Sequence, residues 1–478
     1  MDGNFWLVAR GGGADPRVRM CRRPQRNDAL TFEARLPLVS HQARWCSAAF
    51  SAPKLTKMFD VCIVGAGLSG LAACQRLQQA GLSVTVLEAK GRIGGRFKAH
   101  TDNEFVYDEG AHWVHCADEN ALVKILKPQL PTYVRRPGEI YFSTPAQFLG
   151  DRDNQAIWRF YRKAWIHVEK GASRRREDRA VSTVVSDPRW EIYFNSVFAS
   201  TVGTVPARVS IKDIANYVDS EIDFAVESGL GHHLSVAFSG MPVQFGRKVV
   251  EIDRSEIVRL RTASGDAISA RCCLLTVSPP VMRKLKISPP LPEAHRNSLD
   301  SIRMGLLETV ALEFYEDVFG GPDNVFLYVG SSRGPYLSYL IKPAGRKMAV
   351  AYLGGEEVRG ISGDTECLIA TALRPLARLY RFERRQALRR TVHSNWTGDD
   401  DVMGSLSYVP VGHSGARSEL RRPVDERLFF AGEATSLTAA GSLHGAYEEG
   451  RRGADEILER IGAEQSSRCR LRRGRSLV

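Results

Sequence analysis

The chain has 478 residues, of which 43% are hydrophobic and 25% are charged. This is the composition of a globular protein, and it excludes a wholly disordered chain, a collagen-like fibre and a small disulfide scaffold. The net charge of +12 lies mainly at the ends: residues 1–57 carry ten Lys or Arg against four Asp or Glu, and residues 460–478 carry six against one. The middle is nearly neutral, which argues against nucleic acid as a partner. The sequence contains no run of about 20 apolar residues, so no transmembrane helix is predicted.

Residues 1–57 show no pattern of a folded core and no secretory signal. We expect a disordered or non-native extension, with Met58 as a candidate initiator. Because this segment is poor in acids, an organelle transit peptide is the alternative. The nine cysteines form no CxxC motif, so no metal site is predicted, and their number fits a reducing compartment such as the cytoplasm.

The first predicted elements form a strand–turn–helix–strand unit. Phe59–Val64 is a short apolar run, Leu68–Ala80 has a helical pattern that ends at a glycine, and Ser83–Leu87 is a second β-rich run. The turn after the first strand reads G-x-G-x-x-G. In this context the motif predicts a dinucleotide-binding site.

Each part of that motif has a physical role. Gly65 allows the tight turn, Gly67 lets the backbone approach a pyrophosphate, and Gly70 lets the helix pack closely on the strand. The helix N-terminus offers free N–H groups to the phosphates, and Glu88 can accept hydrogen bonds from ribose hydroxyls. The following run, Lys90–Arg96, brings arginine and glycine to the same place, which favours a phosphate role over a solvated turn.

Later in the chain, strands are predicted at Val249–Ile252, Ile257–Leu260 and Cys272–Val277. Near the end, Leu428–Ala431 reads as a buried strand and Leu443–Leu458 as a long helix. Two glycines at the start of that helix would let its backbone N–H groups meet a ligand. Its positive dipole end could stabilise negative charge on that ligand.

These motifs resemble the flavin-containing amine oxidases, a family that includes monoamine oxidases, polyamine oxidases and lysine-specific histone demethylases. The resemblance spans about residues 59–460. Besides the first motif and Lys90–Arg96, it rests on Asp108–His115, Leu275–Pro280, Ile287–Pro292, Trp396, Gly404–Tyr408, Phe429–Thr435 and Gly441–Ala446.

The resemblance implies an α/β fold: a Rossmann-like FAD-binding domain of the glutathione-reductase type with a second, α+β substrate domain. We expect the FAD-binding domain at 58–118, 238–290 and 391–460, the substrate domain at 119–237 and 291–390, and a basic tail at 461–478. Monoamine oxidases link a cysteine to the flavin. Ser405 stands at that position here, so non-covalent FAD is expected.

The predicted catalytic residues are His115, Thr309 and His112. His115 matches an active-site histidine of animal polyamine oxidases, and an imidazole can orient or deprotonate an amine; a structural histidine is the alternative. The residues predicted to bind the cofactor are Gly65, Gly67, Gly70, Glu88, Arg92, Gly95, Arg96, Gly110, Ala111, His112, Trp113, Val249, Trp396, Gly432, Glu433, Ser442, Leu443 and Ala446.

The sequence departs from the family in two ways. Most family oxidases carry a lysine near flavin N5, and Thr309 occupies that position here. The aromatic rings that sandwich the amine in monoamine and polyamine oxidases fall on Leu406 and Ser442. Tyr408, His112 or Trp113 could supply a substitute ring.

The predicted function is amine oxidation by hydride transfer from the carbon beside nitrogen to FAD, with a small-molecule amine as substrate and oxygen or another molecule as acceptor. One alternative is a related FAD dehydrogenase or desaturase acting on C–C bonds, similar to carotenoid desaturases or protoporphyrinogen oxidase. The other is a flavin-binding interaction protein with an inactive site.

Overall fold

The computed structural model describes residues 58–475 apart from 103–104, 127–131, 135–139, 173–176, 186 and 384–386, and it gives no side chains for 132–134 or after 464. The predictions for residues 1–57 therefore lie outside the described residues. The first predicted unit is confirmed: strand β1 (Phe59–Val64), helix α1 (Leu68–Gln79) and strand β2 (Val84–Leu87) follow one another.

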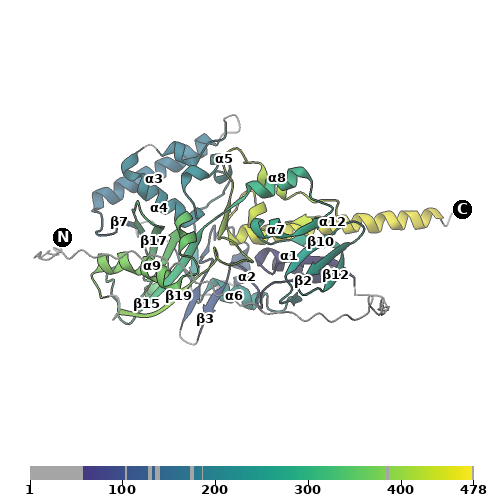
Figure 1. The fold of residues 1–478 in the computed structure, drawn as a ribbon, viewed down its shortest axis with the longest axis horizontal. Helices are drawn as coiled ribbons and strands as arrows, with labels where there is room; N and C mark the ends of the chain where they lie inside the picture. The colour runs from purple at the N-terminus through teal and green to yellow at the C-terminus, as the bar shows by residue number, and fades with distance from the viewer. Residues whose placement is uncertain are drawn as a thin grey trace, which may run out of the picture. The chain divides into compact units, whose positions relative to one another are not determined.

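An eight-stranded sheet forms one half of the described chain (Figure 1). Strand β1 pairs in parallel with β12 on one side and with β2 on the other, which is the arrangement of a Rossmann-like sheet. In spatial order the strands are β13 (Lys286–Ser288), β10 (Val249–Asp253), β11 (Val258–Thr262), β12 (Ala267–Leu275), β1, β2 and β9 (Val243–Gln244), and β21 (Leu428–Phe430) also pairs with β12.

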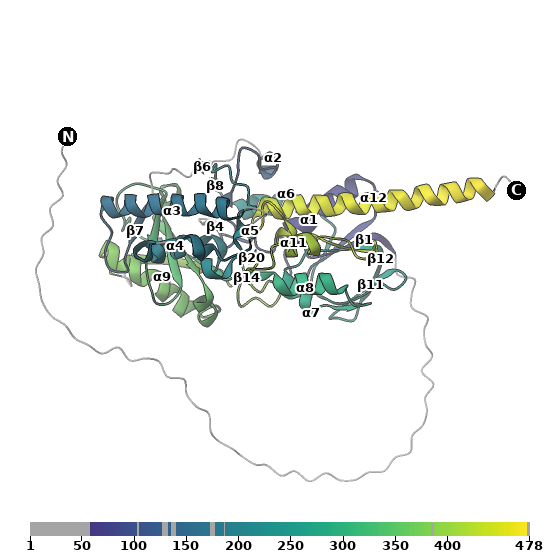
Figure 2. The ribbon, with the colours of Figure 1, turned by 90° about the horizontal axis from the view of Figure 1, so that it is seen from above.

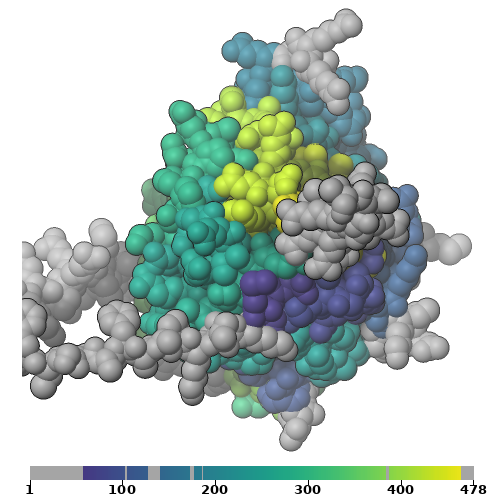
Figure 3. Space-filling view, turned by 90° about the vertical axis from the view of Figure 1, so that its right-hand side faces the viewer, coloured from purple at the N-terminus to yellow at the C-terminus, as the bar shows by residue number. Residues whose placement is uncertain are grey.

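Two helices cover one face of this sheet. Helix α1 packs against α12 (Leu443–Arg475), and both bury apolar side chains against β1 and β12. Figures 1 and 2 show α12 beside α1 and then running past the sheet. Helices α8 (Glu293–Ser301) and α11 (Ala416–Leu420) cover the other face. In the surface view of Figure 3 the start of the described chain, in purple, lies next to teal residues from the middle of the sequence.

A six-stranded mixed sheet forms the other half (Figure 1). Helices α3 (Asp151–Gly171) and α4 (Pro188–Val202) lie on one side of it, and α9 (Thr365–Tyr380) packs on the other. In spatial order the strands are β19 (Leu388–His393), β15 (Leu307–Phe314), β18 (Met348–Gly354), β17 (Tyr336–Ile341), β16 (Val325–Val329) and β7 (Ile140–Ser143).

Short elements connect the two sheets. Three small sheets pair β14 (Arg303–Gly305) with β20 (Leu406–Tyr408), β3 (Ala99–Thr101) with β4 (Val106–Asp108), and β8 (Phe224–Val226) with β5 (Trp113–Val114) and β6 (Thr132–Val134). The remaining helices are α2 (Leu122–Leu126), α5 (Ile211–Ile214), α6 (Leu230–Ala237), α7 (Pro279–Lys284), and the 3-10 turns η1 (Val181–Val184), η2 (Pro206–Arg208), η3 (Pro343–Gly345), η4 (Glu356–Gly360) and η5 (Glu433–Thr435).

The fold class expected from the sequence, an α/β protein with a Rossmann-like sheet, is confirmed. The last helix is longer than predicted: it continues beyond Leu458 to Arg475. Within the described ranges, no helix is both long enough and apolar enough to cross a bilayer. The boundaries between the two expected domains stay a prediction.

Candidate active site

The turn between β1 and α1 is shaped by its glycines. Gly65 has a φ of +103°, which side chains disfavour, and a Cβ on Gly70 would lie 2.0 Å from the Gly65 carbonyl oxygen. At Gly67, by contrast, no heavy atom lies within 4 Å of the Cβ position. Gly67 is the N-cap of α1, and no side chain caps that helix end. The turn therefore leaves open space at a helix N-terminus, which suits a phosphate group.

Glu88 lies directly beyond β2 and beside this turn. Its carboxylate accepts hydrogen bonds from the N–H groups of Ala66 (2.8 Å) and Lys90 (2.9 Å). Burial raises the pKa of Glu88, although these hydrogen bonds oppose the shift. Lys90 in turn forms an ion pair with Asp399 at 2.7 Å, which fixes the segment after Glu88 to the loop after Trp396.

A network of ion pairs and hydrogen bonds around Glu433 lies near the start of α12. Glu433 on η5 pairs with Arg96 at 2.8 Å and accepts hydrogen bonds from Ser407 Oγ (2.6 Å) and Gly441 N (2.9 Å). Burial favours the neutral acid, but Arg96 and then Arg417 outweigh it, so the pKa of Glu433 is lowered. Glu433 is therefore an anion that holds η5, β20 and the Gly441 turn together.

Arg417 continues this network into the other half of the protein. Its guanidinium is 4% exposed, and it binds both carboxylate oxygens of Asp213, at 2.8 and 3.0 Å. It also donates to Ser407 Oγ at 2.7 Å. Such a bidentate pair fixes orientation as well as charge, so it sets α5 relative to β20.

The backbone at Glu109 and Gly110 is a second close contact. Thr309 Oγ1 and the Trp396 indole nitrogen both donate to the carbonyl oxygen of Glu109, at 2.8 and 3.1 Å. A Cβ on Gly110 would lie 1.8 Å from the carbonyl oxygen of Arg96, so only glycine fits there. Thr309 is thus a buried hydrogen-bonding residue of β15 and carries no positive charge.

The neighbour of Thr309 on β15 is a buried carboxylate. Glu308 is 0% exposed and accepts hydrogen bonds from Ser394 Oγ (2.5 Å), Trp396 N (2.9 Å) and Thr397 N (2.7 Å). These contacts hold the loop that carries Trp396 against β15. Since the sequence around Glu308 follows no motif, sequence reasoning did not select it.

His112 lies among aromatic rings near Thr309. Its ring centroid is 5.3 Å from that of Tyr107 and 5.6 Å from that of Tyr352. Burial lowers the pKa of His112 to about 4, so its imidazole is neutral at pH 7. Trp113 packs against Phe326, with 5.7 Å between ring centroids.

His115 lies in a different, polar group of side chains. Its Nδ1 donates to Asp223 Oδ1 at 3.0 Å, and Asp223 is only 6% exposed. His444, at the start of α12, completes the group; burial and then repulsion by His115 lower its pKa to about 4. The ring of Tyr217 stands 6.3 Å from that of His444, nearly at a right angle to it.

Ser442 has a structural role at the same helix end. Its hydroxyl accepts a hydrogen bond from the N–H of Gly445 at 3.0 Å, which is an N-cap contact. Leu443 and Ala446 belong to the first turn of α12. The His115 group therefore faces a capped, positively polarised helix terminus.

The comparisons with known proteins agree with this geometry. The sequence matches the flavin containing amine oxidoreductases over residues 68–182 and 229–458, and the chain belongs to this family. It is an oxidoreductase that uses FAD to oxidise an amine.

Several relatives cover most of this chain. It is 28% identical to polyamine oxidase 2 of Arabidopsis thaliana, over 85% of this chain and 90% of that protein. It is 26% identical to lysine-specific histone demethylase 2 of Homo sapiens, over 83% of this chain and 53% of that longer protein. A redesigned putrescine oxidase has the same fold, with a TM-score of 0.71 and 21% identity over 84% of this chain and 99% of that one.

The residues present fit FAD. The open space at Gly67 faces an uncapped helix end, Glu88 stands beside it, and the Gly110 turn admits no side chain. Arg92 binds the carbonyl oxygens of Ile93 and Gly95 and so shapes the adjoining loop. Val249 is buried in β10 and Gly432 has a φ of +137° before η5. The individual contacts of these residues with FAD stay predictions.

Sequence reasoning missed the partners of the selected residues. Asp223, Arg417, Asp213, Glu308 and Tyr217 all lie outside the motifs. Tyr408, one of the rings considered for the amine site, instead packs in a cluster with α4. The ring of Tyr217 stands beside that of His444, and the sequence held no signal for it beyond an isolated tyrosine.

Proposed function

We propose that the chain oxidises a di- or polyamine, and that the amine binds at the His115–Asp223 pair. The single observation that carries this is the contact between His115 Nδ1 and the buried Asp223 carboxylate. A buried carboxylate beside neutral His444 attracts a cation. The similarity to polyamine and putrescine oxidases supports the same substrate class.

FAD, when bound, would supply the hydride acceptor for the carbon beside the amine nitrogen. Asp223 orients the His115 imidazole, which takes a proton from the substrate ammonium and leaves a neutral amine. The Tyr217 ring packs beside the alkyl chain of the substrate, in place of the missing cage rings. The first turn of α12 supplies the positive end of its dipole.

The electron acceptor is proposed to be a molecule other than oxygen. Thr309 supports this, because it contributes a hydroxyl hydrogen-bonded to Glu109 where most family oxidases carry a lysine. Oxygen reduction builds negative charge that a nearby cation would stabilise. A cytoplasmic location is also proposed; Cys62, Cys74, Cys272 and Cys273 form no disulfides, which fits a reducing compartment.

The test is anaerobic mixing of the FAD-loaded protein with spermidine or with benzylamine, followed by flavin absorbance. Spermidine is expected to bleach the flavin. Asp223→Asn should raise the apparent Kd for spermidine by about tenfold or more, since one charge-assisted contact is lost. Asp219→Asn is the matched control, because it removes an exposed carboxylate nearby.

Three results would contradict the proposal. Bleaching by benzylamine alone would exclude polyamine specificity. Equal effects of the two substitutions would exclude Asp223 as the amine partner. No bleaching with any amine would favour the inactive flavoprotein, and bleaching with an apolar polyene would favour the C–C dehydrogenase.

A further inference from the structure

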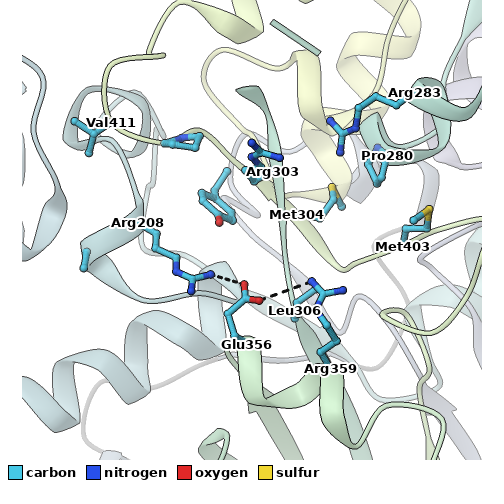
Figure 4. Close-up of a pocket in the computed structure, with 13 residues that line it drawn as sticks. Arg208, Pro280, Arg283, Arg303, Met304, Leu306, Glu356, Arg359, Met403 and Val411 are labelled. Carbon is cyan, nitrogen blue, oxygen red and sulfur yellow. Dashed lines mark ion pairs between the residues drawn. The ribbon is translucent and has the colours of Figure 1, made fainter. Parts of the chain in front are cut away.

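A cavity of about 630 Å³ is lined by none of the residues of the His115 group. Its walls come from η2, α7, β14, η4 and residues 403–411, so it opens between elements of the two sheets (Figure 4). None of the residues predicted to bind FAD lines it. The cavity therefore needs an explanation separate from the oxidation site.

The cavity carries an excess of positive charge. Four arginines line it, Arg208, Arg283, Arg303 and Arg359, and Glu356 is the one acidic residue in the lining. Glu356 pairs with Arg208 at 2.6 Å and with Arg359 at 3.7 Å. Figure 4 shows Glu356 between these two arginines, with Arg303 and Arg283 above them in the view.

The two remaining arginines, Arg283 and Arg303, line the same cavity and repel each other. Burial, followed by repulsion from Arg303, lowers the pKa of Arg283. Asp300 opposes this shift. Arg283 donates to the carbonyl oxygens of Leu299 and Ile302 at the end of α8, whereas the described residues give Arg303 no ion pair. An anion bound by Arg303 would reduce its repulsion with Arg283.

The rest of the lining is apolar. Met304, Met403 and Tyr408 form walls beside the arginines. The volume falls within the range of about 300–1,000 Å³ that is typical of small-molecule sites. An anion alone would use the charged side of the cavity only, so the apolar walls point to a ligand with an organic body.

We propose that this cavity binds a small organic phosphate, with Arg303 as the main phosphate ligand and Arg283 beside it. The planar guanidinium fork of arginine matches two phosphate oxygens at once. Met304 and Tyr408 pack against the organic part. The site is independent of the amine substrate, and its ligand is distinct from the flavin.

The test uses the FAD-loaded protein, so that the flavin site is filled, and ADP and pyrophosphate as probes in titration calorimetry. One ADP is expected to bind per chain, more tightly than pyrophosphate, and more weakly as NaCl is raised. Arg303→Gln should weaken ADP binding about tenfold or more, and Arg303→Lys should weaken it less because the charge is kept. Flavin absorbance should not change on ADP addition.

Arg333→Gln is the matched control, since Arg333 is exposed on a loop outside the cavity lining. It should leave ADP affinity unchanged. The proposal is overturned if ADP does not bind at millimolar concentration, or if Arg303→Gln and Arg333→Gln bind it equally. Equal affinities for ADP and pyrophosphate would refute the role of the apolar walls.

Discussion

Thr309 is a buried side chain of β15, hydrogen-bonded to the carbonyl oxygen of Glu109, at the position where the family resemblance implies a lysine. We expect Thr309→Lys to speed the reoxidation of reduced flavin by oxygen, because the ammonium would stabilise the developing negative charge. The expected gain is roughly 10²–10³ in rate, with anaerobic reduction by the amine little changed. Stopped-flow absorbance measures both steps.

Thr309→Met is the control for this experiment, because it adds comparable length without charge. Equal acceleration by both variants would mean that altered packing, and not charge, limits the reaction. Fast reoxidation in the unmodified protein would contradict the prediction.

His444 gives the active site a dependence on pH. Its folded pKa of about 4 lies below the ordinary value of 6.5, so the unfolded chain binds a proton first as pH falls. Above pH 6.5, His444 does not lower the free energy of unfolding. As the pH falls from 6.5 to 4, that free energy decreases progressively because the unfolded chain takes up the proton first. From pH 7 to pH 5 this costs about 2 kcal/mol.

Urea unfolding of the wild type and of His444→Gln at pH 7 and pH 5 measures this difference. The wild type should lose about 2 kcal/mol more than the variant over that interval. If both lose the same free energy, His444 keeps an ordinary pKa in the folded protein.

At the scale of elements, the contact between α1 and α12 depends on one glycine. A Cβ on Gly450 would lie 2.1 Å from the carbonyl oxygen of Ser69, which belongs to the first turn of α1. Gly450→Ala should therefore destabilise the protein by about 1–3 kcal/mol and weaken FAD binding as well. Thermal unfolding and FAD titration are the measurements.

Gly462 on the same helix is the matched control, because its Cβ position has no neighbour within 4 Å. Gly462→Ala should stabilise the protein by about 0.5–1 kcal/mol through helix propensity. If both alanines act alike, backbone flexibility and not the close contact decides the effect.

The sequence could predict elements whose signals are local. The glycine turn, Glu88 and the strand before η5 each lie within one short run of residues, and the structure has these elements in the predicted order. Residues 459–475 are rich in Arg, which is a good helix former, and contain no proline, so α12 continues past Leu458.

Contacts between distant residues could not be predicted in the same way. His115 and Asp223 are separated by 108 residues, and Arg417 and Asp213 by 204. Single acids and arginines are common in any chain, and only the folded backbone decides which of them meet. The motifs therefore identified His115 and Glu433, but they did not identify Asp223, which hydrogen-bonds to His115, or Arg417, which helps to keep Glu433 ionised.

At the scale of the whole molecule, the cofactor site joins the start and the end of the described chain. We expect FAD to be released by acid precipitation, because Ser405 is a hydroxyl donor to the Leu307 carbonyl oxygen and cannot form a thioether. Removal of FAD should lower the melting temperature, since a ligand at 1,000 times its Kd contributes about 4 kcal/mol. Yellow colour that stays in the pellet would contradict non-covalent binding.

The pairing of β21 with β12, and of α12 with α1, also constrains how the protein is made. The ribosome synthesises β1 early, whereas β21, which joins the same sheet, and α12, which covers it, follow only from Leu428 onward. Until then the nascent chain exposes the apolar face that α12 later covers, so chaperones have a binding surface for most of translation. A premature stop codon before this point leaves a chain that cannot hold FAD, and cofactor loading thereby marks the chains that were translated past the start of α12.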